Sequence, residues 1–237
     1  MVLGRARRRS LIAAFAASAA AAWTERVLAD RPPPAGPPDA SSGLLDPGPL
    51  TAAERAALER GGVVRREIAL DLAEGHFVGG VAYVVVQAPP GALMSVRGDV
   101  TSYTEILPLC VEARLVGESG TRRGGEAVVA IRHKGRYGGA DYAMHIARER
   151  SRVRFWLERS LPHDLDDAWG YFRVEPAGAD ASLLTYAALM DVGFIARLLF
   201  EERVRDLALG TPQLVKDHVE RRWAAVLARR RRRREER

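Results

Sequence analysis

Histidine is the side chain best suited to acid–base chemistry and metal binding near neutral pH, and this chain has five. No two of them stand at the HxH or HExxH spacing that directs two imidazoles toward one metal ion. The sequence also contains no GxSxG turn, no phosphate-binding P-loop and no GxGxxG turn after a strand. We therefore predict no catalytic residues, no metal and no cofactor, and we favour a non-enzymatic role. The histidines are His76, His133, His145, His163 and His218.

The densest group of candidate metal ligands is the segment 163–167, which reads His-Asp-Leu-Asp-Asp. Imidazole and carboxylate groups could hold a cation there, but we favour a solvated loop over the mouth of a cavity. The single cysteine, Cys110, excludes an intrachain disulfide and any multi-cysteine metal site. Its neighbours Leu109 and Val111 predict a small core residue instead of a reactive thiol.

The first residues have the pattern of an export signal. A basic start, an apolar run from Leu11 to Trp23 and small residues before Asp30 are typical of such signals, and the run is shorter than the ~20 residues of a membrane-spanning helix. Arg8-Arg9 resembles a twin-arginine signal. An uncleaved amphipathic helix is the alternative. We predict a signal over residues 1–29, and therefore a periplasmic or envelope-associated protein of a bacterium, whose preference for Arg over Lys indicates a GC-rich genome.

A linker and a short helix are predicted next. Residues 30–49 hold seven prolines among Gly, Ser and Asp, which predicts an extended segment without a core. Residues 50–62 predict a short helix, in which Thr51 is the N-cap and Glu54 completes a capping box. Gly61-Gly62 end this helix.

Residues 63–229 predict one domain of strands followed by a helix. The segment 91–107 predicts one or two short helices, and the period becomes helical from Gly193 to about Arg229, with a break or kink at Gly210-Thr211-Pro212. Short connections favour antiparallel pairing of neighbouring strands. The predicted strands are 63–70, 77–87, 109–116, 126–137, 141–148, 152–158, 169–175 and 182–190.

Three segments resemble family motifs. Val84–Gly91 is similar to a strand followed by A-P-x-x, Asp99–Pro108 resembles D-x-x-x-Y-x-x-x-x-P, and Trp169–Pro176 with Leu184-Thr185-Tyr186 resembles G-x-x-x-x-x-P followed by L-x-Y. Together with the element order, they resemble the START-like or SRPBCC superfamily, which includes polyketide cyclases and coenzyme Q-binding proteins. The chain departs from the family where a Trp often occupies the first helix, since it has Leu93 and Met94.

The resemblance implies an α+β helix-grip fold, in which a curved antiparallel sheet of about six to seven strands wraps around a long C-terminal helix. It further implies an apolar cavity between sheet and helix that binds or transports a hydrophobic small molecule such as a lipid, a quinone or a polyketide-like compound. Alternating strand positions and the helix supply candidate lining residues. They are Tyr142, Met144, Phe155, Trp169, Tyr171, Tyr186, Phe194, Leu198, Val215 and Val219.

Two other functions stay open. A cyclase, aromatase or hydrolase could use the same cavity, and it would require a polar cluster inside. A protein-interaction module would have the cavity filled by side chains. Fold alone does not decide among these functions.

The formal charge of +6 is concentrated at the two ends. Residues 1–29 carry five Arg and one Glu, and residues 229–237 carry seven Arg and two Glu, so the part between them is mildly acidic. Arg229 to Arg234, in the tail 230–237, predict peripheral contact with an anionic membrane, with a solvated helix end as the alternative. Nucleic acid is not an expected partner of an exported protein.

Overall fold

The computed structural model describes residues 45, 48–72, 75–96, 99–121, 124–135 and 138–236, with the backbone alone at 120, 121, 124, 138 and 194–200. The chain divides into two units, Met1–Ala35 and Gly36–Arg237, and every described residue belongs to the second. The predicted export signal and most of the predicted linker lie outside the described residues.

Helix α3 (Ala52–Glu59) begins with the predicted capping box. The Thr51 hydroxyl accepts the Glu54 N–H at 3.2 Å, and the Glu54 carboxylate accepts the Thr51 N–H at 2.7 Å. Glu54 also pairs with Arg66 in the first strand at 2.6 Å. The guanidinium of Arg66 is the main reason that the pKa of Glu54 is lowered to about 2.

Eight antiparallel strands form one sheet in the order β1-β2-β8-β7-β6-β5-β4-β3. The predicted fold class is confirmed, with slightly more strands than expected because the first hairpin joins the sheet through the pairing of β2 with β8. The strands are β1 (Val63–Leu72), β2 (Gly75–Val86), β3 (Cys110–Thr121), β4 (Gly124–Gly135), β5 (Gly138–Arg148), β6 (Arg152–Leu157), β7 (Asp167–Pro176) and β8 (Ser182–Asp191).

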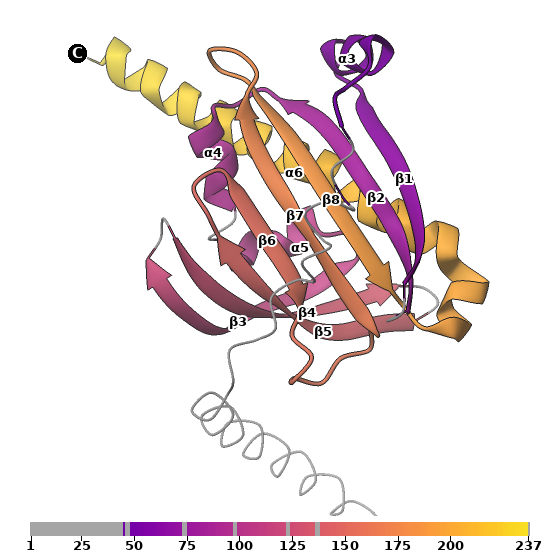
Figure 1. The fold of residues 1–237 in the computed structure, drawn as a ribbon. Helices are drawn as coiled ribbons and strands as arrows, with labels where there is room; N and C mark the ends of the chain where they lie inside the picture. The colour runs from indigo at the N-terminus through magenta and orange to yellow at the C-terminus, as the bar shows by residue number, and fades with distance from the viewer. Residues whose placement is uncertain are drawn as a thin grey trace, which may run out of the picture. The chain divides into compact units, whose positions relative to one another are not determined.

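The sheet bends so strongly that β3, β4 and β5 run across the direction of β1, β2, β7 and β8 (Figure 1). Three short helical segments connect β2 to β3: α4 (Pro90–Ser95), the 3-10 turn η2 (Val100–Ser102) and α5 (Tyr103–Ile106). They lie on the same face of the sheet as the long helix α6 (Phe194–Glu235). We call this the α6 face.

Helix α6 differs from the sequence prediction in two ways. It runs through Pro212 as one helix, so of the predicted break or kink the break is absent, while the ribbon changes direction along its length (Figure 1). Burial of Ala208, Leu209 and Thr211 holds the turns around this proline in place, and this packing outweighs the hydrogen bond that Pro212 cannot donate. The helix also continues beyond Arg229 to Glu235. Of the helices in the described part of the chain, none combines the length and the apolar character needed to cross a membrane.

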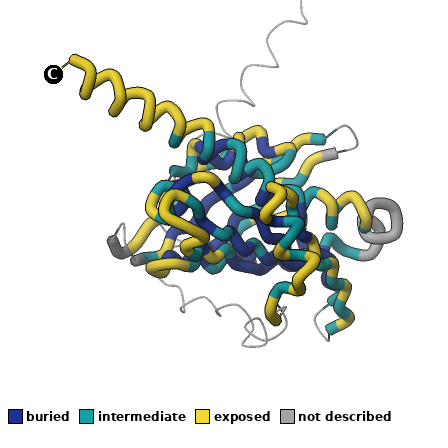
Figure 2. Tube along the Cα trace, turned by 90° about the horizontal axis from the view of Figure 1, so that it is seen from above, coloured by how far each residue is buried: buried dark blue, intermediate teal, exposed yellow. Residues whose placement is uncertain are grey.

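Both faces of the sheet carry an apolar cluster. On the α6 face, strand residues such as Val129, Met144 and Leu184 pack with Val215 and Val219 of α6. On the opposite face, Leu45 and Leu58 cover a second cluster of strand side chains. Figure 2 shows the buried positions along the strands and the exposed positions on the far end of α6. Most central strands are therefore buried on two sides.

Candidate ligand-binding cavity

An apolar cavity of about 130 Å³ lies between the α6 face of the sheet and helices α5 and α6. Cores usually contain few voids larger than one water molecule, so this space is not ordinary packing. We call it the inner cavity. Its walls are Val96, Tyr103, Ile106, Leu107, Ile131, Tyr142, Met144, Ile146, Val153, Phe155, Leu165, Ala168, Phe172, Leu184, Tyr186, Ala188, Met190, Thr211 and Val215.

A second hollow of about 380 Å³, the outer cavity, adjoins the first. It extends toward Pro108, His133 and the part of α6 that holds Arg203 and Leu207. The two hollows have a common wall, so they lie side by side. The residues of this common wall are Leu107, Tyr142, Leu165, Tyr186, Met190 and Thr211.

The structure brings together five of the ten residues predicted to line the cavity. Tyr142, Met144, Phe155, Tyr186 and Val215 are all in the wall of the inner cavity. Val219 belongs to the same apolar cluster, one turn of α6 further along, but it is not in the wall. The side chains of Phe194 and Leu198 lie outside the described residues.

Trp169 and Tyr171 were wrongly predicted to line the cavity. Both lie on the opposite face of the sheet. There the ring centroids of Trp169 and Phe77 are 6.2 Å apart, and the Tyr171 hydroxyl donates to the Leu45 carbonyl at 2.9 Å. Because β7 is buried on both sides, its alternation could not show which set of side chains meets the ligand. The cavity side of β7 presents Ala168 and Phe172.

The polar centre of the cavity is a hydrogen-bonded pair on neighbouring strands. Tyr142 Oη lies 2.8 Å from His133 Nε2, and His133 Nδ1 lies 2.8 Å from the Pro108 carbonyl oxygen. The two rings stack, with centroids 5.4 Å apart. Burial lowers the pKa of His133 and raises the pKa of Tyr142 well above its ordinary value, so both side chains are neutral at neutral pH.

Two more phenols face the inner cavity. Burial raises the pKa of Tyr103 to about 12 and the pKa of Tyr186 to about 12. Thr211 on α6 is a smaller, opposing influence on the pKa of Tyr186. The inner cavity is therefore apolar over most of its surface, with uncharged hydroxyl groups gathered near the common wall.

Charged side chains of α6 bond to β2, to the residue that follows it and to η2 beside the cavity. Lys216 donates to the Val85 carbonyl at 2.6 Å, and the Glu220 carboxylate accepts the Gln87 N–H at 2.7 Å. On the other side, Arg222 pairs with Asp99 at 2.7 Å, and Asp99 is the N-cap residue of η2. The Arg222 hydrogen bond is the main cause that lowers the pKa of Asp99.

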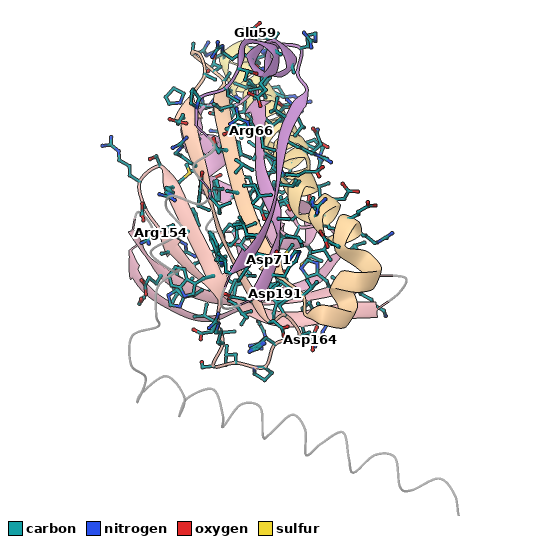
Figure 3. All side chains as sticks on the ribbon, turned by 45° about the vertical axis from the view of Figure 1, so that its right-hand side comes forward. Glu59, Arg66, Asp71, Arg154, Asp164 and Asp191 are labelled. Carbon is teal, nitrogen blue, oxygen red and sulfur yellow. The ribbon has the colours of Figure 1, made fainter. Side chains whose placement is uncertain are left out.

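The segment 163–167 is a structured loop beside the end of β8. Asp166 N donates to the Asp191 carbonyl at 3.0 Å, and Figure 3 shows Asp164 and Asp191 at the same end of the sheet. Asp164 accepts the Asp141 N–H at 2.7 Å, while Leu165 contributes to both cavities. Over the residues that the structure describes, no three His, Cys, Asp or Glu side chains are grouped as metal ligands would be.

Solved structures identify the architecture. A STAR-related lipid transfer protein from Xanthomonas axonopodis (fragment 25-204) superposes with a TM-score of 0.56, at 17% identity, over 67% of this chain and 93% of that one. The chain therefore has the START-like, helix-grip fold. The protein TTHA0849 from Thermus thermophilus gives a TM-score of 0.52, at 15% identity, over 62% of this chain and 97% of that one.

Human STARD10 also superposes on the START-like domain, with a TM-score of 0.51, at 13% identity, over 68% of this chain and 70% of that one. No family model matches the sequence. No curated protein matches it either.

The sequence prediction missed His133, Thr211 and Ala168 in the cavity of the START-like domain. His133 has no spacing to another histidine that is typical of a metal or catalytic motif, so such motifs did not select it. A signal was present, because His133 stands two residues after Ile131 on the same strand face, and Ile131 pairs with Tyr142 in the sheet. To use this signal, one must know which residues pair between the two strands. A single sequence does not give that pairing.

Proposed function

We propose that the START-like domain binds a hydrophobic small molecule, such as a lipid, a quinone or a polyketide-like compound, between the sheet and α6. The unfilled inner cavity carries this proposal. Side chains leave about 130 Å³ of apolar space there. A purely structural core would be expected to close such a space, whereas a ligand that filled it would pack against its apolar walls. The Xanthomonas protein with the same fold is named a lipid transfer protein, which supports the same class of ligand.

The experiment loads delipidated protein with a bacterial total lipid extract and, separately, with decylubiquinone, and measures bound mass by native mass spectrometry. We expect one bound molecule per chain in at least one of the two samples. Ala168→Phe should abolish uptake, because the new ring occupies the inner cavity. Trp169→Phe is the matched control, since Trp169 lies on the opposite face and its replacement should leave uptake unchanged. A wild-type protein that stays empty in both samples contradicts the proposal.

The cavity chemistry supports binding over turnover. A general acid or base works best when its pKa lies near the working pH. Burial instead moves the pKa of Tyr142 and of Tyr186 further from neutrality. These phenols therefore serve as hydrogen-bonding groups, and a cyclase or hydrolase reaction in this cavity is the weaker candidate.

A second proposal concerns the last turns of α6, which extend past the sheet with exposed side chains (Figure 2). Arg229–Arg234 form a run of cations beside Val226 and Leu227, which are 37% and 39% exposed. Each basic residue near an anionic bilayer contributes about 1 kcal/mol. We propose that this run contacts anionic lipid headgroups while the domain exchanges its ligand.

Vesicle co-sedimentation tests this contact. Binding to phosphatidylglycerol vesicles should be strong at low salt, weaken as salt screens the charges, and be absent on phosphatidylcholine vesicles. Replacement of Arg229–Arg234 by Gln should remove it. Arg114→Gln, a charge change on an exposed position of β3, is the control. Equal binding to neutral vesicles would contradict the proposal.

Export from the cytoplasm is likewise a proposal, since residues 1–29 are its only basis. Fractionation of cells that express the full chain should place the protein in the periplasm or envelope. N-terminal sequencing should find that the mature chain begins at Asp30. An intact Met1 in the cytoplasmic fraction would contradict it.

A further inference from the structure

The hydrogen-bond direction between His133 and Tyr142 follows from the groups on either side. The Pro108 carbonyl can only accept a hydrogen bond, so His133 Nδ1, at 2.8 Å, must be the nitrogen that carries hydrogen. A neutral imidazole has one N–H, which leaves Nε2 as an acceptor. The Tyr142 hydroxyl, 2.8 Å from Nε2, therefore donates its hydrogen to His133.

Neutrality of His133 is supported by its surroundings. Burial lowers its pKa, and the Pro108 hydrogen bond is the smaller, opposing influence. Stacking of the imidazole on the Tyr142 ring, with an interplanar angle of 10°, holds both groups in this arrangement. Tyr142 therefore donates its hydroxyl hydrogen to His133. Toward the cavity, its oxygen can only accept a hydrogen bond.

Two other hydroxyl groups belong to the common wall, those of Tyr186 on β8 and Thr211 on α6. A hydroxyl can donate as well as accept a hydrogen bond, so these two groups place no requirement on the polarity of a ligand. The requirement comes from Tyr142, whose hydrogen is already used.

The common wall is also unsuited to a charged group. It contains Leu107, Leu165 and Met190 beside the hydroxyls, and its ionisable groups are phenols that stay protonated at neutral pH. A carboxylate or ammonium placed there would lose its hydration without gaining an opposite charge from this wall.

We propose that the ligand is an apolar molecule with an uncharged hydroxyl group, whose hydrogen is accepted by Tyr142. This inference rests on the proposed function, because it requires that the cavity hold a ligand. A hydroxyl can donate to the Tyr142 oxygen, whereas a ketone can only accept a hydrogen bond and an alkane can neither donate nor accept. The ligand class is therefore an alcohol, a phenol or an enol on an apolar body.

The test compares 1-decanol, 2-decanone and decane by native mass spectrometry or calorimetric titration. The wild-type domain should bind decanol about tenfold more tightly than decanone, as expected for one additional hydrogen bond. His133→Phe keeps an aromatic ring against Tyr142 but removes the acceptor, which frees the Tyr142 hydrogen. Decanone should then gain affinity, and the preference should disappear.

Two further variants separate the hydrogen bond from general packing. Tyr142→Phe should weaken decanol about tenfold and leave decanone unchanged. Tyr171→Phe removes a phenol on the opposite face of the sheet, where its hydroxyl donates to the Leu45 carbonyl, so it should leave the preference intact. The wild-type comparison decides the question even where a variant fails to fold.

The possible failures are distinguishable. Equal binding of all three probes, or tighter binding of decanone by the wild type, overturns this inference and leaves the proposed function standing. Absence of binding for all three, together with no uptake of lipid extract or quinone, overturns both. Decanol preference that survives in Tyr142→Phe also overturns the inference, because the preference would then come from another group.

Discussion

Gly170 on β7 pairs directly with Phe155 on β6, and its missing side chain makes room for the Phe155 ring in the cavity wall. A Cβ atom on Gly170 would lie 2.7 Å from Phe155 Cζ and would also collide with the Ala187 carbonyl oxygen. The Phe155 ring stacks on Tyr186 with centroids 5.9 Å apart. One glycine thereby sets the position of two aromatic walls of the inner cavity.

Gly170→Ala is expected to lower the free energy of unfolding by about 1–3 kcal/mol, because the added carbon overpacks a backbone contact that cannot move freely. It should also weaken ligand uptake by displacing Phe155. Urea unfolding measures the first effect. Gly91→Ala is the control, since nothing lies within 4 Å of a Cβ there. A Gly170→Ala protein as stable as the wild type would show that the strands relax around the new methyl group.

Ser182→Ala should cost about 1–3 kcal/mol of stability. Ser182 is 0% exposed, and its hydroxyl donates to the Ala88 carbonyl at 2.7 Å, so the substitution leaves a buried oxygen without this partner. Ser95→Ala is a matched control, because its hydroxyl donates to the Ala92 carbonyl at the same 2.7 Å but is exposed. Thermal unfolding of the two variants should therefore differ clearly. Equal losses would mean that burial of the Ser182 bond adds nothing.

The sequence was sufficient for the elements and their order. Gly and Pro clusters between β-branched runs placed all eight strands within a few residues, and Thr51 with Glu54 identified the start of α3. These signals are local, since turn conformation, capping and strand propensity depend on neighbours in the chain. Their agreement with one another supported the helix-grip prediction.

The cavity walls were harder to predict, because burial on both faces of the sheet erases the contrast on which alternation depends. Trp169 is 1% exposed and is as deeply buried as the residues of the cavity wall, yet it belongs to the other cluster. Only the covering elements, α6 on one face and Leu45 with α3 on the other, distinguish the two sets. Pro212 shows a related limit, since α6 runs through it as one helix although proline removes a hydrogen bond of the helix.

Stability should fall as the pH drops below about 6.5, the ordinary pKa of histidine, in part through His133. Its pKa is lowered by burial in the folded state, so below 6.5 the unfolded chain binds a proton that the folded chain does not. The loss should level off once the pH passes the folded-state pKa. Urea unfolding over a pH series measures it.

The His133→Phe variant separates this residue from the other four histidines. Its stability should depend less on pH below 6.5 than that of the wild type, because one proton-binding group has been removed from the unfolded chain. Identical pH profiles for the two proteins would contradict the burial of a neutral His133.

The ion pair between Asp99 and Arg222 should stabilise the cover of the cavity at neutral pH. Asp99→Asn is expected to cost about 1 kcal/mol or less, because Arg222 is largely exposed and water screens the pair. The pKa of Asp99 is lowered in the folded state by Arg222 and by neighbouring hydroxyls, so its contribution is complete above the ordinary carboxyl pKa of 3.8 and is lost as the pH falls below it. The stabilities of wild type and variant should therefore converge in acid.

Glu175→Gln is the matched control for that prediction. Glu175 pairs with Arg173 at 3.2 Å on the surface of β7, where both side chains are nearly half exposed, and such pairs contribute little. Its removal should leave stability and ligand uptake unchanged at every pH.

Asp99→Asn should in addition speed the release of a bound ligand, because it loosens α6 from the short helices over the cavity. The release rate is measured as the transfer of bound ligand to acceptor vesicles. An unchanged rate would mean that the pair between Asp99 and Arg222 does not limit ligand release.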